Sequence, residues 1–408
     1  MIHQHTFANG LTLLAEPMDY VRSATAYLMV PCGAAFDPPE TPGIAGVLSD
    51  MMSRGAGSRN SRELSSAFDA LGVDRGESVD TLNLWFSGGT LGRNLPASLE
   101  LFADVIRRPH LPADELEPAQ ALALQDIQAL DDSPQEKVML ELKKRYLPPP
   151  LNADKLGTVE GIEAITADLL RAHHQKYVRP NGAIFAVAGN IDWSALKDQV
   201  ERLFGDWERG DNKPVAIQPH RPQSAHLEKD TQQTQIAMAF PSASIADADY
   251  YAARGTIGVL SGGMSARLFT EVREKRGLCY SVFATHESFQ TFGALIAYAG
   301  TRADRAQETL DVMTAELRKL KDGVEADEIE RVKAGLKASL IMRQESTSAR
   351  AGAIASDWFL LGRVRSFDEI QTAIDGLTAQ AVVDCAVKWP ASNLTVVTLG
   401  PKELSIPR

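Results

Sequence analysis

The tetrapeptide Gly46-Val47-Leu48-Ser49 occurs a second time in this chain, 212 positions later, as Gly258-Val259-Leu260-Ser261. The same offset relates the dipeptide Met52-Ser53 to Met264-Ser265. Four matching residues can arise by chance, so the sequence on either side of the two copies decides how the match is interpreted.

A short apolar segment that ends in proline precedes each copy. The segments are Ala26–Pro31 and Ile236–Pro241, and both are typical of buried strands. Because strand, proline and helix recur in the same order, an internal duplication is the better interpretation. Turn-forming residues then cluster at 210–222. We therefore predict an N-terminal half at residues 1–212, a linker at 213–222 and a C-terminal half at 223–408.

The pattern within each half predicts an α+β fold. Strands are indicated at 24–31, 182–189, 235–240 and 293–299, among others, and helices at 95–107 and 326–344. A long helical pattern covers 116–146 and is interrupted near Ser133-Pro134, where proline can open a new helix. An antiparallel-rich sheet covered by helices satisfies this order in each half.

Composition narrows the class of protein. The 408 residues are 44% hydrophobic and 23% charged, close to the average of soluble globular proteins. The formal net charge of −11 disfavours nucleic acid and anionic membrane surfaces as partners. No apolar run approaches the roughly 18 residues of a membrane span. The first residues do not form a signal peptide, so we expect a cytoplasmic location, or a periplasmic one if a leader was removed.

Metal and nucleophile motifs are missing from the sequence itself. The three cysteines form no C-x-x-C pair, and no two of the eight histidines are spaced i, i+4. Phosphate-binding loops, nucleophile elbows and dinucleotide fingerprints are also absent from the sequence. These motifs therefore do not identify a type of reaction or a metal site.

The segment Thr41–Met52 resembles the zinc helix of the pitrilysin/insulinase family of zinc metallopeptidases, which includes the mitochondrial processing peptidases. The family pattern is Pro-Gly-x-Ala-His-x-x-Glu-His, in which two histidines bind zinc and the glutamate activates water. Here those three positions hold Gly46, Ser49 and Asp50, and Asp126 matches the family's third ligand. Two carboxylates do not replace three protein ligands, so the resemblance implies no metal in this chain.

The second half is similar to the family's C-terminal signature over residues 263–282. The family's arginine and tyrosine, seven positions apart, match Arg273 and Tyr280. The resemblance implies that they contact the substrate backbone and the developing oxyanion. We expect Arg273 to end a helix and Tyr280 to lie in the next strand, with Gly277 turning the chain between them. The alternative is that Arg273 is a solvated helix residue and Tyr280 a core residue.

The resemblance covers essentially the whole chain and implies two homologous halves that face each other as a clam-shell. It implies the non-zinc subunit of a heterodimeric zinc metalloendopeptidase acting on unfolded peptides. A homologous partner would carry H-x-x-E-H and the zinc, and this chain alone would be inactive. A homodimer in isolation is possible. The main alternative is a catalytically inactive structural or peptide-binding subunit, like the core proteins of a respiratory complex. An unrelated hydrolase that uses Asp50 and Asp126 is the third interpretation.

Overall fold

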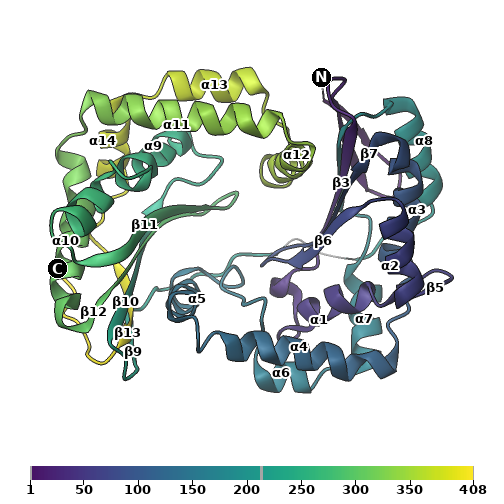
Figure 1. Ribbon diagram of the computed structural model, residues 1–408, viewed down its shortest axis with the longest axis horizontal. Helices are drawn as coiled ribbons and strands as arrows, with labels where there is room; N and C mark the ends of the chain where they lie inside the picture. The colour runs from purple at the N-terminus through teal and green to yellow at the C-terminus, as the bar shows by residue number, and fades with distance from the viewer. Residues whose placement is uncertain (1, 212–214, 408) are drawn as a thin grey trace. The chain divides into compact units, whose positions relative to one another are not determined.

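The computed structural model describes residues 2–211 and 215–407, which form two compact units (Figure 1). The first unit comprises Met1–Ala129, Pro149–Pro219 and Arg343–Phe359. The second comprises Leu130–Pro148, His220–Met342 and Leu360–Arg408.

A six-stranded sheet forms the centre of the first unit, in the order β1-β2-β8-β3-β7-β6. The pairs are antiparallel except β2 with β8, which run parallel. A separate two-stranded ribbon, β4 with β5, lies outside this sheet. The strands are β1 (His3–Thr6), β2 (Thr12–Pro17), β3 (Ser23–Val30), β4 (Gly55–Ala56), β5 (Arg59–Asn60), β6 (Asp74–Val79), β7 (Leu84–Leu91) and β8 (Ile184–Gly189).

The sheet of the second unit has five strands in the order β9-β13-β10-β12-β11, again with one parallel pair, β9 with β13. Its order and strand directions match those of β2-β8-β3-β7-β6 in the first unit. Two sheets of the same topology are what a duplicated sequence produces, and the predicted α+β class is confirmed. The strands are β9 (Ala225–Glu228), β10 (Gln233–Ser242), β11 (Cys279–Ser288), β12 (Gly293–Arg302) and β13 (Thr395–Gly400).

Helices pack on the sheet of each unit and bury its apolar face. In β3, alternate residues from Ala24 to Val30 point into the core of the first unit, as the two-residue period of a strand requires. Helix α2 begins with a capping box between Asn60 and Glu63, which satisfies two backbone donors. The helices of this unit are α1 (Ile44–Met52), α2 (Ser61–Ala70), α3 (Leu95–Arg107), α4 (Leu116–Ala129), α6 (Val159–Glu163), α7 (Ala167–Tyr177), α8 (Trp193–Phe204) and most of α12 (Thr347–Leu361).

The core of the second unit lies between its sheet and the helices that follow β10 and β12. Ile236, Met238 and Phe240 of β10 are buried there against Leu310 and Met313. The helices are α5 (Pro134–Tyr146), α9 (Tyr250–Ser261), α10 (Ala306–Lys319), most of α11 (Ala326–Gln344), α13 (Phe367–Asp375) and α14 (Ala379–Lys388). A π-helical segment, η4 (Phe269–Glu274), precedes β11.

Each unit contains one helix that comes from the other half of the sequence. Helix α5 belongs to the second unit, where it packs on β10 and β13, and α12 belongs largely to the first. The two helices begin 213 residues apart, at residues 134 and 347, close to the offset of the sequence repeat. They are therefore equivalent helices of the duplication, exchanged reciprocally. The contiguous division at 212 and 223 stays a prediction about the repeat.

Helix α12 covers the face of the first sheet opposite the main core. Its Arg350 forms an ion pair of 2.6 Å with Glu16 of β2, and both side chains are largely buried, 8% and 16% exposed. The hydroxyls of Thr347 and Thr25 share a buried hydrogen bond of 2.9 Å. Ala351 packs in a small apolar cluster on the same face. Polar contacts therefore join α12 to this sheet.

No helix in the described part of the chain is both long enough and apolar enough to cross a membrane.

Candidate functional site

Helix α1 carries three of the four positions that the family resemblance places around zinc. The Asp37 carboxylate accepts hydrogen bonds from the backbone of Gly43 at 2.7 Å and of Ala45 at 3.2 Å, and so anchors the start of this helix. Burial raises the pKa of Asp37 to about 7, although the two backbone donors oppose that shift. The start of α1 is therefore held by a half-buried carboxyl group.

The four degenerate positions lie together. Gly46, Ser49 and Asp50 of α1 and Asp126 of α4 all line one hollow of about 320 Å³ in the first unit. The structure thus brings together the residues that the sequence predicted as one site. Glu77, Ser78 and Val79 of the edge strand β6 line the same hollow.

One carboxylate of this hollow, that of Asp50, belongs to an ion-pair network. Asp50 accepts a hydrogen bond of 2.7 Å from Arg54, and Arg54 also binds Glu115 at 2.7 Å. The hydroxyl of Ser49 is buried and has no hydrogen-bond partner among the described residues. Sequence reasoning missed Arg54, although its spacing of four residues from Asp50 on a helix is a sufficient signal.

These residues do not fit zinc. Within residues 2–211 and 215–407, no three His, Cys, Asp or Glu side chains converge as a possible metal site. The carboxylate of Asp50 is already engaged by Arg54, and Ser49 stands where the family has its general base. A catalytic zinc needs three protein ligands and an open position. We therefore derive no metal-dependent step in this hollow.

Arg273 and Tyr280 of the second unit are adjacent in space. Arg273 lies in the π-helical segment η4, and Tyr280 lies in β11. Gly277 has a φ of +58°, a conformation that glycine adopts readily, and turns the chain between them. The Arg273 guanidinium lies 5.0 Å from the centroid of the Tyr280 ring and 4.8 Å from that of Phe269. The predicted turn is confirmed, but the helical element is a π-helix.

The position of Tyr280 leaves its side chain accessible. The pairing of β11 with β12 shifts register between Cys279 and Ser281, so Tyr280 is the bulged residue of an edge strand. The Tyr280 side chain is 84% exposed. The alternative that Tyr280 is a core residue is therefore wrong.

Ion pairs fix the segment that presents this pair. Arg267 donates two hydrogen bonds to the Glu328 carboxylate, at 2.7 and 2.6 Å, and both side chains are largely buried. Arg276 and Lys275 both bind Glu271 at 2.6 Å and lower the pKa of that carboxyl. The segment therefore holds the guanidinium of Arg273 next to the exposed phenol of Tyr280. Sequence reasoning missed Phe269, which precedes Arg273 by four residues.

Comparisons with known proteins agree with this fold along the whole chain. The family model described as insulinase (peptidase family M16) matches residues 13–148, and the one described as peptidase M16 inactive domain matches residues 164–336. A relative from Bacillus subtilis, the uncharacterised zinc protease YmxG, is 29% identical over 404 residues, which is 98% of each chain.

Two solved structures share the fold. The peptidase M16 inactive domain from Pseudomonas fluorescens superposes with a TM-score of 0.90 at 24% identity, over 100% of this chain and 99% of that chain. A protease from Helicobacter pylori gives a TM-score of 0.88 at 21% identity, over 98% and 99% of the two chains. With the two family models matching successive parts of the chain, this protein belongs to peptidase family M16, as a member whose zinc-motif positions no longer carry zinc ligands.

Proposed function

We propose that this chain is the non-zinc subunit of a heterodimeric zinc metalloendopeptidase. Its partner is a homologous subunit that carries H-x-x-E-H and the zinc, and the substrates are unfolded peptides. The observation that carries the proposal is the contact between half-buried Arg273 and exposed Tyr280, in a chain whose own zinc-motif positions hold no ligand set. The chain alone is expected to be inactive.

The chemistry of the two side chains fits the proposed roles. Arginine keeps its charge and presents five donors in a fixed fork, which suits the carbonyl groups of an extended peptide. A tyrosine hydroxyl can donate to the oxyanion that develops at the scissile carbonyl. An exposed tyrosine on a strand bulge contributes little to a core, so packing does not account for Tyr280.

A second candidate is a structural or peptide-binding subunit without a catalytic role. The edge strand β6 favours it, because an edge strand can accept a peptide as an additional strand and Glu77 of β6 lines the hollow beside it. In that case Arg273 and Tyr280 have no part in turnover.

The experiment that separates the two candidates compares two preparations. One is the chain purified gently from its native host, and the other is the recombinant chain alone. We expect chelator-sensitive cleavage of an unstructured peptide only in the first, together with a copurified zinc-bearing subunit. If neither preparation cleaves, the second candidate replaces the first.

The role of Tyr280 is tested in the reconstituted complex. Tyr280→Phe is expected to lower turnover about 100-fold, as the loss of one oxyanion donor does, without loss of assembly. Tyr20→Phe is the matched control, since Tyr20 is 70% exposed and its hydroxyl donates only to the Gln344 carbonyl. Unchanged turnover in the Tyr280 variant would exclude the proposed role.

A further inference from the structure

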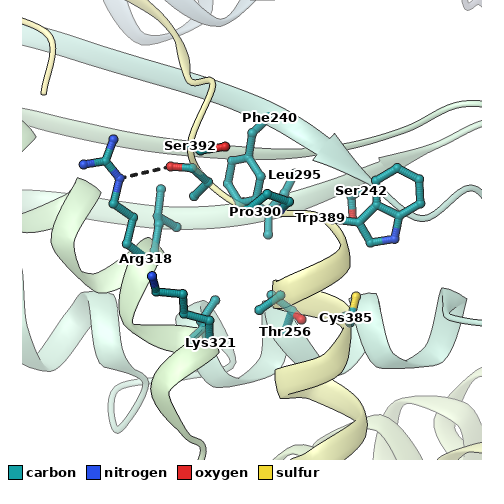
Figure 2. Close-up of a pocket in the computed structure, with 14 residues that line it drawn as sticks. Phe240, Ser242, Thr256, Leu295, Arg318, Lys321, Cys385, Trp389, Pro390 and Ser392 are labelled. Atoms are coloured by element: carbon teal, nitrogen blue, oxygen red, sulfur yellow. Dashed lines mark hydrogen bonds between the residues drawn. The ribbon is translucent and has the colours of Figure 1, made fainter. Parts of the chain in front are cut away.

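A separate pocket of about 220 Å³ opens in the second unit, between its sheet and helices α9, α10 and α14 (Figure 2). Phe240 of β10 and Leu295 of β12 form one wall, and Trp389 and Pro390 close it after α14. Protein interiors rarely retain unfilled space much larger than a water molecule. A pocket of this size is therefore a candidate binding site.

The charged groups of this pocket are both cationic. Arg318 and Lys321 stand on one side of it, and Trp389 lies on the other (Figure 2). The Arg318 guanidinium is anchored by hydrogen bonds of 3.1 Å to the carbonyls of Ala391 and Pro407. The Lys321 side chain lines the pocket and is exposed to solvent. None of the 14 described residues that line it carries a carboxylate.

Two of the remaining polar groups in the pocket need no polar ligand, whereas the buried indole N–H of Trp389 has no hydrogen-bond partner among the described residues. The Thr256 hydroxyl donates to the carbonyl of Ala252 at 3.1 Å, within its own helix. Burial raises the pKa of the Cys385 thiol to about 11, so that side chain is neutral and behaves as a small apolar group. An apolar interior with cations at one end complements a molecule that has an apolar chain and one anionic end.

We propose that this pocket binds an aliphatic carboxylate, with its chain against Phe240 and Leu295 and its carboxylate beside Lys321. A cavity of about 150 Å³ accommodates the six carbons of benzene, so about 220 Å³ accommodates a chain of about eight. Either a free fatty acid or the apolar C-terminus of a peptide has this chemistry. The site does not depend on Arg273, Tyr280 or a zinc-bearing partner.

Calorimetric titration of the full chain tests the proposal, with hexanoate, octanoate, decanoate, octan-1-ol and N-acetyl-leucyl-leucine as probes. Each buried methylene is worth about fourfold in affinity, so octanoate should bind about 15-fold more tightly than hexanoate. Decanoate should gain little more, because the pocket is then full. Octan-1-ol should bind about fivefold more weakly than octanoate, since it lacks the charge that pairs with Lys321.

Two variants locate the site. Lys321→Ala is expected to weaken octanoate binding about fivefold. Ala386→Leu, which adds bulk to a residue that lines the pocket, is expected to weaken it about 15-fold by displacing two methylenes. Lys402→Ala is the matched control, because Lys402 is exposed and does not line the pocket.

The outcomes are distinct. Saturable binding that is weakened by these amounts in both pocket variants but not in the control supports the proposal. The tighter binder of octanoate and N-acetyl-leucyl-leucine identifies the source of the carboxylate. Equal binding of octan-1-ol and octanoate would overturn the carboxylate assignment. Binding of all the acids that is unchanged by Ala386→Leu, or no saturable binding of any acid, would overturn the site.

Discussion

Replacement of Arg350 by methionine tests whether the exchanged helix α12 is an integral part of the first unit. The Arg350 side chain is 8% exposed and that of Glu16 is 16% exposed, so the pair is nearly withdrawn from water. Removal of one partner leaves an uncompensated buried charge, which costs about 3–5 kcal/mol of stability. We expect Arg350→Met to lower the free energy of unfolding of the first unit by this amount.

The assay is urea-induced unfolding, combined with limited proteolysis of the segment at residues 343–362. The double variant Glu16→Leu with Arg350→Met should be more stable than the single Arg350→Met variant, because no charge then remains buried. Arg305→Met serves as control, since its pair with Glu308 is 40% and 49% exposed and is worth less than about 1 kcal/mol. A double variant that is no more stable than Arg350→Met would refute the reasoning.

Two further predictions concern the start of helix α1. Burial raises the pKa of Asp37 from 3.8 to about 7, so its protonated form contributes stability that is complete below pH 3.8 and lost as the pH rises through 7. Asp37→Asn should reduce this fall in the free energy of unfolding with pH. Urea titrations between about pH 4 and 8 measure it, and a pH dependence equal to that of the unsubstituted chain would contradict the prediction. A Cβ at Gly157 (φ +71°) would lie 2.1 Å from the Pro42 carbonyl oxygen, so Gly157→Ala should cost more than about 2 kcal/mol. Gly72→Ala (φ +60°, open space) should cost only about 1 kcal/mol, and equal shifts in Tm would contradict the clash.

The elements with strong local patterns were predictable from the sequence. The helices at 95–107 and 326–344 have the predicted bounds. Apolar residues recur at helical spacing in the first, whereas the second is rich in helix formers and buries Ile329 and Val332. The break near Ser133-Pro134 also lies between two helices, α4 and α5. The clustering of Gly46, Ser49, Asp50 and Asp126 followed from the family resemblance rather than from any pattern in the residues themselves.

Features that depend on tertiary context were not predictable. Strand β6 reads Asp-Arg-Gly-Glu-Ser-Val, a polar edge strand without apolar alternation. The π-helical turn at 269–274 has no local signature that separates it from an α-helix. The apolar periodicity of a helix also does not identify the sheet on which it packs. The exchange of α5 and α12 between the two units was therefore not predictable from the sequence. The carboxylate pocket draws on residues from 240 to 392, which no motif joins.

The exchanged helix has a consequence for synthesis on the ribosome. The strands of the first sheet are complete once β8 ends at Gly189, but α12 ends at Leu361, 172 residues later. At 5–20 residues per second, translation of that interval takes roughly 10–30 s. During this time Glu16 and Thr25 lie on a face of the nascent sheet that α12 does not yet cover. Final closure of the first unit therefore waits until α12 has been synthesised, late in translation.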